Sequence, residues 1–194
     1  MRELKNVEEK ILDRVLYLIG KNGSSNVSIR AIAKEAQVNV SAINYYFRSK
    51  EEMMKQVQEF YIYNTIEAYS ALDREDYNDY EKLILCANEI MEYALRYPGV
   101  LVIQKEAAEK RHSDELSSRI IELTQDMNKK LDKVLLKVIN SHEESFIYDR
   151  MIFLSSILHP TDKTDTLGFN DDIISDKEKR LQYIKYVIKR IKGQ

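Results

Sequence analysis

The amino-acid sequence predicts an all-α fold, and the scarcity of backbone-breaking residues is the first reason. The 194 residues include five glycines and two prolines, whereas these two types make up roughly 12% of average proteins. A β-protein needs such residues at its hairpins and corners, so this chain favours long helices with few turns. The second reason is helical spacing, as in the single apolar stripe of Ile11, Leu12, Val15, Leu16 and Ile19.

Apolar periodicity and stop signals then predict each helix in order. Gly23 follows the first apolar stripe, and Pro98-Gly99 and Pro160 interrupt later ones, as expected at helix ends. The predicted helices cover about residues 4–22, 29–36, 40–47, 49–72, 79–97, 99–110, 114–140, 144–158 and 176–191. Residues 159–172 are predicted to form one long loop.

Candidate N-caps support these starting points. Serine, aspartate and asparagine side chains accept hydrogen bonds from the free amides of a first turn, and a glutamate three residues later completes a capping box. The predicted caps are Ser28, Asn39, Ser49 with Glu52, Asp79, Ser113, and Ser175 with Glu178. The helix at 144–158 has apolar residues all around it, so we expect it to be buried on more than one side.

The net charge of −2 hides an uneven distribution. Residues 21–50 hold five cations, Lys21, Arg30, Lys34, Arg48 and Lys50, against the single acid Glu35, so this segment carries +4 and the rest of the chain −6. Such asymmetry is typical of a nucleic-acid-facing segment joined to an acidic body, although a solvated helix face gives the same pattern.

Nothing in the sequence points to catalysis. The three histidines are scattered, and the single cysteine, Cys86, lies in an apolar run typical of a core. We therefore expect no enzyme, no metal and no cofactor. The charged N-terminus lacks a signal peptide and the apolar runs are far shorter than the roughly 20 residues that span a bilayer. We expect a cytoplasmic protein without membrane contact.

Two of the predicted helices, 29–36 and 40–47, are short and are joined by the three residues Gln37–Asn39. Two short helices joined in this way and packed on a longer preceding helix are typical of a helix-turn-helix, whose second helix enters the major groove of DNA. An ordinary corner between two helices has the same spacing. The spacing alone therefore leaves both interpretations open.

The outer face of the helix at 40–47 favours DNA. Ile43 and Phe47 lie four residues apart and are expected to face the core, which leaves a small, polar and aromatic face without an acid. Asn44 can hydrogen-bond to adenine, and tyrosine hydroxyls can donate to phosphate. The predicted DNA-binding residues are Ser28, Asn39, Val40, Ser41, Ala42, Asn44, Tyr45, Tyr46 and Lys50.

Three segments, Ile11–Asp13, Val27–Ala36 and Val38–Glu51, resemble in order the N-terminal domain of the TetR family of bacterial transcriptional regulators. The resemblance covers about residues 11–57. It implies an N-terminal three-helix DNA-binding domain, here 1–48, and a larger C-terminal helical domain, here 49–194, which binds a small molecule and dimerises through its last two helices. It also implies phosphate contacts from Ser28, Tyr46 and Lys50. Gln37 stands where the family often has glycine, so this turn must accept a larger residue.

The C-terminal region has no comparable motif, and its candidate residues follow from residue type and helical spacing. Residues predicted for an apolar ligand pocket are Phe60, Tyr63, Met91, Tyr93, Ile103, Met127 and Phe153. Those predicted for a dimer interface are Phe146, Met151, Leu154, Leu158, Leu181, Ile184, Ile188 and Ile191.

These observations together predict a dimeric, ligand-responsive regulator that binds a palindromic DNA operator. A repressor released by a small-molecule effector is the expected form. The alternative is a helical homodimeric interaction protein without sequence-specific DNA binding.

Overall fold

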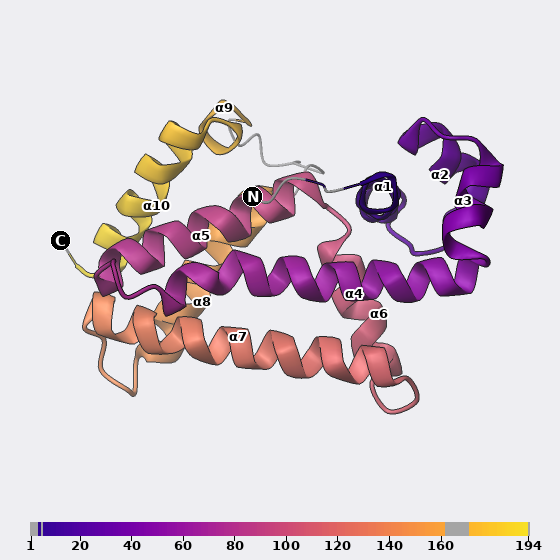
Figure 1. Cartoon of the computed structure of the whole chain (residues 1–194). Coiled ribbons are helices and arrows are strands. Elements are labelled where there is room, and N and C mark those ends of the chain that lie inside the picture. Colours follow the sequence, from indigo (N-terminus) through magenta and orange to yellow (C-terminus); the bar gives the residue numbers. More distant parts are fainter. Residues whose placement is uncertain (1–3, 5, 162–170, 194) are drawn as a thin grey trace. The chain divides into compact units, whose positions relative to one another are not determined.

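The computed structural model describes residues 4, 6–161 and 171–193, and all regular structure within them is helical (Figure 1). This confirms the predicted all-α fold. The described residues form ten α-helices, which are α1 Val7–Asn22, α2 Ile29–Ala36, α3 Val40–Phe47, α4 Lys50–Tyr69, α5 Asp79–Arg96, α6 Val100–Lys110, α7 Glu115–Ile139, α8 Phe146–Leu158, α9 Asp171–Ser175 and α10 Lys177–Ile191. Short 3₁₀ helices cover Ser70–Asp73 and His159–Thr161. None of the helices described is both long and apolar enough to cross a membrane.

The chain forms two compact units. The helix-turn-helix unit consists of Arg2–Thr65 and Arg96–Thr124, and the C-terminal unit consists of Ile66–Leu95 and Gln125–Gln194. The helices α4 and α7 contribute residues to both units. The predicted boundary between residues 48 and 49 separates a DNA-binding domain from the rest of the chain by function, not by compactness. This boundary stays a prediction.

In the helix-turn-helix unit, α1 packs against α2 and α6, and α2 packs against α3 (Figure 1). All five residues of the predicted apolar stripe on α1 are buried. Gly23 ends α1 with a φ of 65°, the left-handed conformation that glycine adopts without steric cost. The core of this unit is therefore organised around α1, as the helical spacing predicts.

Two glycines allow α1 to approach the start of α6 very closely. A Cβ atom on Gly20 would lie 2.1 Å from the backbone nitrogen of Gly99, and one on Gly99 would lie 2.7 Å from the Gly20 nitrogen. Neither position has room for any side chain, because the obstructing atoms belong to backbone. The two glycines thus set the distance between α1 and α6.

In the C-terminal unit, a single apolar cluster joins residues of α5, α7, α8 and α10, among them Cys86, Met91, Leu135, Phe153 and Ile188. The predicted core position of Cys86 is confirmed, and burial raises the pKa of its thiol. Near this cluster the buried Arg180 side chain of α10 donates to Asn88 Oδ1 at 2.9 Å and pairs with Glu92 at 3.1 Å. These contacts join α10 to α5.

Three of the predicted N-caps are displaced by one residue. Asn78, not Asp79, accepts the Glu81 amide at 3.0 Å, and the Glu81 carboxylate accepts the Asn78 amide in return. Asp114, not Ser113, caps α7. Ser175 ends the short helix α9, so Asp176 caps α10 instead. In each case the neighbouring residue is also a good cap, and the local sequence does not choose between them.

Within a single chain the helix predicted at 144–158 is not buried on several sides. This helix, α8, buries Phe153 and Ile157 and leaves a row of large apolar side chains on its surface. The row consists of Ile147, Tyr148, Met151 and Ile152, each more than half exposed. Of the predicted loop at 159–172, residues 162–170 lie outside the described part of the chain, whereas 159–161 form a 3₁₀ helix.

Candidate nucleic-acid interface

The turn between α2 and α3 has the predicted helix-turn-helix geometry. Ser28 Oγ accepts the Ala31 amide at 3.1 Å and starts α2, and Asn39 Oδ1 accepts the Ala42 amide at 2.7 Å and starts α3. Between them Gln37 adopts a φ of 57° and a ψ of 43°. This left-handed conformation is the reason that glycine suits the position, and here a glutamine occupies it with some backbone strain.

The predicted recognition helix, α3, is anchored by two side chains. Ile43 and Phe47 are 2% and 1% exposed, as predicted from their spacing. Side chains on the opposite face are free to meet another molecule, most of all Tyr45, which is 81% exposed. The remaining predicted contact residues on this helix are also at the surface, with Val40, Ser41, Asn44 and Tyr46 exposed and Ala42 half-buried.

The start of α4 completes this surface. Ser49 Oγ accepts the Glu52 amide at 3.1 Å, as the capping box predicts, whereas the Ser49 amide donates to Phe47 and not to Glu52. Lys50 is half-buried, and its Nζ donates to Asn26 Oδ1 at 3.2 Å. The predicted phosphate contact thus lies beside the loop that leads into α2. Arg48, between α3 and α4, has a φ of 60°, a strained backbone conformation that no residue pattern indicated.

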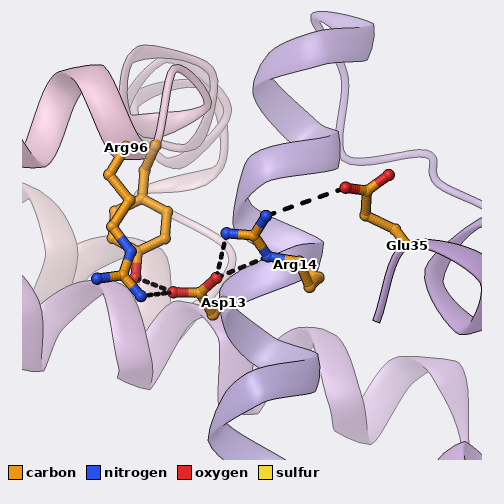
Figure 2. A network of polar contacts seen from close by, with 5 residues as sticks. Asp13, Arg14, Glu35 and Arg96 are labelled. Atoms are coloured by element: carbon orange, nitrogen blue, oxygen red, sulfur yellow. Dashed lines mark hydrogen bonds and ion pairs between the residues drawn. The ribbon is translucent and has the colours of Figure 1, made fainter. Parts of the chain in front are cut away.

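A buried carboxylate fixes α1 behind these helices. Asp13, 1% exposed, accepts from Arg14 Nε at 2.7 Å, from the Tyr97 hydroxyl at 2.5 Å and from Arg96, and Arg14 also pairs with Glu35 of α2 at 3.9 Å (Figure 2). A buried charge is tolerated only when partners of this kind surround it. The network therefore links α1 both to α2 and to the segment just before α6.

Sequence reasoning did not identify this network. Asp13 lies inside an apolar stripe, and in the sequence only the family resemblance includes it. Its partners Arg96 and Tyr97 lie more than 80 positions away. The sequence does contain one signal for it, which is a charged residue between the apolar positions of a helix. Because such residues are rarely buried without a partner, this position indicates a buried ion pair.

The residues predicted for a ligand pocket belong to different units. Phe60, Tyr63 and Ile103 lie in the helix-turn-helix unit, and Tyr63 is 46% exposed. The other four, Met91, Tyr93, Met127 and Phe153, lie in the C-terminal unit, where Met91 and Phe153 are fully buried core residues. The assignment of these residues to a ligand stays a prediction.

The residues predicted for a dimer interface are placed in two different ways. Ile184 and Ile188 are buried in the core of their own C-terminal unit and present no surface to a partner. Met151 is 58% exposed and lies in the apolar row on α8. The other five, Phe146, Leu154, Leu158, Leu181 and Ile191, are half-buried at the edge of the core. The interface itself also stays a prediction.

The N-terminal segment is similar to known bacterial regulators. Residues 11–57 match the family model for "Bacterial regulatory proteins, tetR family". A probable HTH-type transcriptional regulator, YttP of Bacillus subtilis, is 42% identical over 57 residues, which span 29% of this chain and 28% of that protein. The nucleoid occlusion factor SlmA of Serratia proteamaculans is 24% identical over 155 residues, 79% of this chain and 78% of that protein.

Solved structures extend the likeness to the whole fold. The ketosteroid transcriptional regulator KstR2 of Mycobacterium tuberculosis superposes with a TM-score of 0.70 at 16% identity, over 96% of this chain and 95% of that one. The fatty acid degradation regulator FadR of Bacillus halodurans gives a TM-score of 0.57 at 19% identity, over 99% and 97%. Residues 11–57 thus match the DNA-binding segment of the TetR family of bacterial regulatory proteins, and the chain shares a helical fold along its length with the solved structures.

Proposed function

We propose that this protein is a transcriptional regulator that binds a palindromic DNA operator as a homodimer and releases it when a small-molecule effector binds. The observation that carries the proposal is the exposed, acid-free face of α3 within the segment that matches the family. The match of residues 11–57 to the family model supports a DNA-binding regulator. The repressor role, the dimer and the effector response are the finer part of the proposal.

The chemistry of the α3 face supports insertion into the major groove. Small side chains at its N-terminal end, Ser41 and Ala42, permit close approach to base edges, and the Asn44 amide can pair with adenine. Tyr46, 37% exposed, packs edge-on against Tyr45 with ring centroids 5.3 Å apart. Its hydroxyl is the proposed donor to a phosphate beside the recognition helix.

The proposed response uses a shift between two populations of the dimer. In one, the two recognition helices lie one turn of DNA apart, and in the other an effector favours a different spacing. The effector's difference in affinity for the two states sets the size of the response. Helix α4 is the proposed link, since it begins at Lys50 beside the DNA-binding face and contributes residues to both units.

A genome-wide footprint of the full-length protein tests the proposal. Occupancy of one or a few palindromes near promoters, with release by cellular extracts, is the expected result. Failure to prefer any palindrome over random DNA at moderate salt would refute it and favour the helical interaction protein without specific DNA binding. Many sites spread along the chromosome would instead point to a role on the nucleoid, as the name of the Serratia relative indicates for that protein.

A further inference from the structure

A cavity of about 630 Å³ lies within the helix-turn-helix unit, beside the first turns of α4. Its volume lies in the range of pockets that hold drug-sized molecules. Its walls come from the loop between α1 and α2, from α4, from α6 and from the region where α7 begins. The lining residues are Ser25, Asn26, Lys50, Glu51, Met54, Lys55, Val57, Gln58, Ile103, Glu106, Lys110, Asp114 and Ser117.

The three acids of this lining already have partners. Glu106 accepts the Ser25 amide at 3.1 Å, and Asp114 accepts the Ser117 amide at 2.8 Å in capping α7. Glu51 pairs with Lys55 at 3.8 Å. Hydrogen bonding from Ser117 lowers the pKa of Asp114, so this carboxylate serves the fold as an anion.

Two cations of the lining differ from the acids in this respect. Lys50 donates to the neutral Asn26 side chain at 3.2 Å. Among the described residues neither Lys50 nor Lys110 forms an ion pair, although the charge of Lys110 helps to lower the pKa of Asp114. Both ammonium groups therefore retain donors for an added anion. The half-buried Met54 gives the same cavity an apolar wall, whereas Val57 and Ile103 of the lining are 0% and 5% exposed.

We propose that this cavity binds a small organic carboxylate whose charged end is held by Lys50 and Lys110 and whose apolar body lies against Met54. Charge-assisted hydrogen bonds to two ammonium groups fix the head, and contact of the body with the Met54 side chain adds to the affinity. Of the residues predicted for a ligand pocket, Ile103 is part of this lining and the other six are not.

Occupation of this cavity has a direct consequence for DNA, which rests on the proposed regulatory function. Lys50 is also a predicted phosphate contact, so a bound carboxylate competes with DNA phosphate for the same ammonium group. The cavity also adjoins the Glu106 contact to Ser25, which holds the loop leading to Ser28. A ligand here thus acts on two of the proposed phosphate contacts at once.

Titration calorimetry of the full-length protein tests the site without DNA. Decanoate and naphthoate are the probes, decanol lacks the charge, and acetate lacks the apolar body. Saturable binding of either carboxylate, with much weaker binding of decanol and acetate, is expected. Lys110→Gln should weaken carboxylate binding about tenfold through loss of one charge-assisted contact. Lys105→Gln, an exposed lysine of the same helix outside the lining, should leave it unchanged.

The proposal is overturned if neither carboxylate binds, or if Lys110→Gln and Lys105→Gln behave alike. Competition with DNA is measured separately at constant ionic strength, because DNA affinity itself falls with salt. A protein that shows Lys110-dependent carboxylate binding but prefers no DNA sequence retains the site and refutes only the regulatory function. A protein that binds DNA sequence-specifically but binds neither carboxylate refutes the proposed site and leaves the regulatory function intact.

Discussion

Asp13 on α1 forms an ion pair with Arg96, the last residue of α5, although 83 positions separate them in sequence (Figure 2). The Asp13 side chain is 2% exposed and that of Arg96 is 26% exposed. Because Arg14 and Tyr97 complete the shell around the carboxylate, the pair connects the helix that supports the recognition helix to the segment just before α6. The stability of the DNA-binding surface therefore depends on residues outside the helix-turn-helix itself.

Asp13→Ala should destabilise the protein by about 3 kcal/mol, because it leaves Arg96, Arg14 and the Tyr97 hydroxyl without their shared acceptor. Urea denaturation followed by circular dichroism measures the loss. Asp126→Ala is the control, since Asp126 forms an exposed pair with Lys129 and its removal should cost less than about 1 kcal/mol. Equal losses in the two variants would contradict a supporting role for the Asp13 network.

Gly20→Ala should destabilise the protein by about 1–3 kcal/mol through overpacking against the Gly99 backbone. The sign of this change in the free energy of unfolding distinguishes a close helix contact from an ordinary helix position. In an ordinary helix interior the same change stabilises by about 0.5–1 kcal/mol, because alanine loses less backbone entropy than glycine. A gain in the urea midpoint would show that α1 and the start of α6 lie further apart than described.

Burial and then the hydrogen bond to Asp13 raise the pKa of Tyr97 above its usual value. The folded protein thus keeps this proton to higher pH than the unfolded chain does. The associated stability is complete below about pH 10 and is lost as the pH rises beyond it. Free energies of unfolding between about pH 9 and pH 11 should therefore fall more steeply for the wild type than for Tyr97→Phe. Tyr61, whose pKa burial also raises, titrates in both proteins and cancels in the comparison.

Substitutions on and beside α3 should separate base contacts from phosphate contacts. Asn44→Ala should relax the preference for one operator base by about 1–3 kcal/mol. Tyr46→Phe and Lys50→Ala should instead weaken binding to all DNA sequences alike. Of these two, only Lys50→Ala should lower the salt dependence of DNA binding, because it removes a charge. Fluorescence anisotropy with operator variants at several salt concentrations measures both effects. A uniform loss for Asn44→Ala would refute its role in base recognition.

Met151→Asp should convert the proposed dimer to a monomer that remains folded, because Met151 belongs to the exposed apolar row of α8. Light scattering gives the mass and circular dichroism checks the fold. Ile188→Asp is the contrasting variant. It places a charge in the core of the C-terminal unit, so it should unfold the protein and not merely dissociate it. A folded dimer of Met151→Asp would locate the interface elsewhere.

Several features of this protein follow from local sequence. The helices of the helix-turn-helix begin and end where short-range interactions dictate: Ser28 and Asn39 cap their own helices, and Ile43 and Phe47 face inward because they lie four residues apart. These interactions span a few residues, so the linear pattern contains them. The left-handed Gln37 lies where the resemblance to the family implies a glycine, so this conformation follows from the resemblance and not from the local pattern.

Only the tertiary structure decided how distant segments share their polar and apolar groups. Nothing near Asp13 indicates Arg96 as its partner, and nothing near Gly20 indicates the backbone of Gly99. The same holds for α8 and α10, where apolar spacing marks Met151 and Ile188 alike although one is exposed and the other buried. Periodicity identifies the residues that avoid water, but the packing of the whole chain determines which of them its own core covers and which remain for a partner.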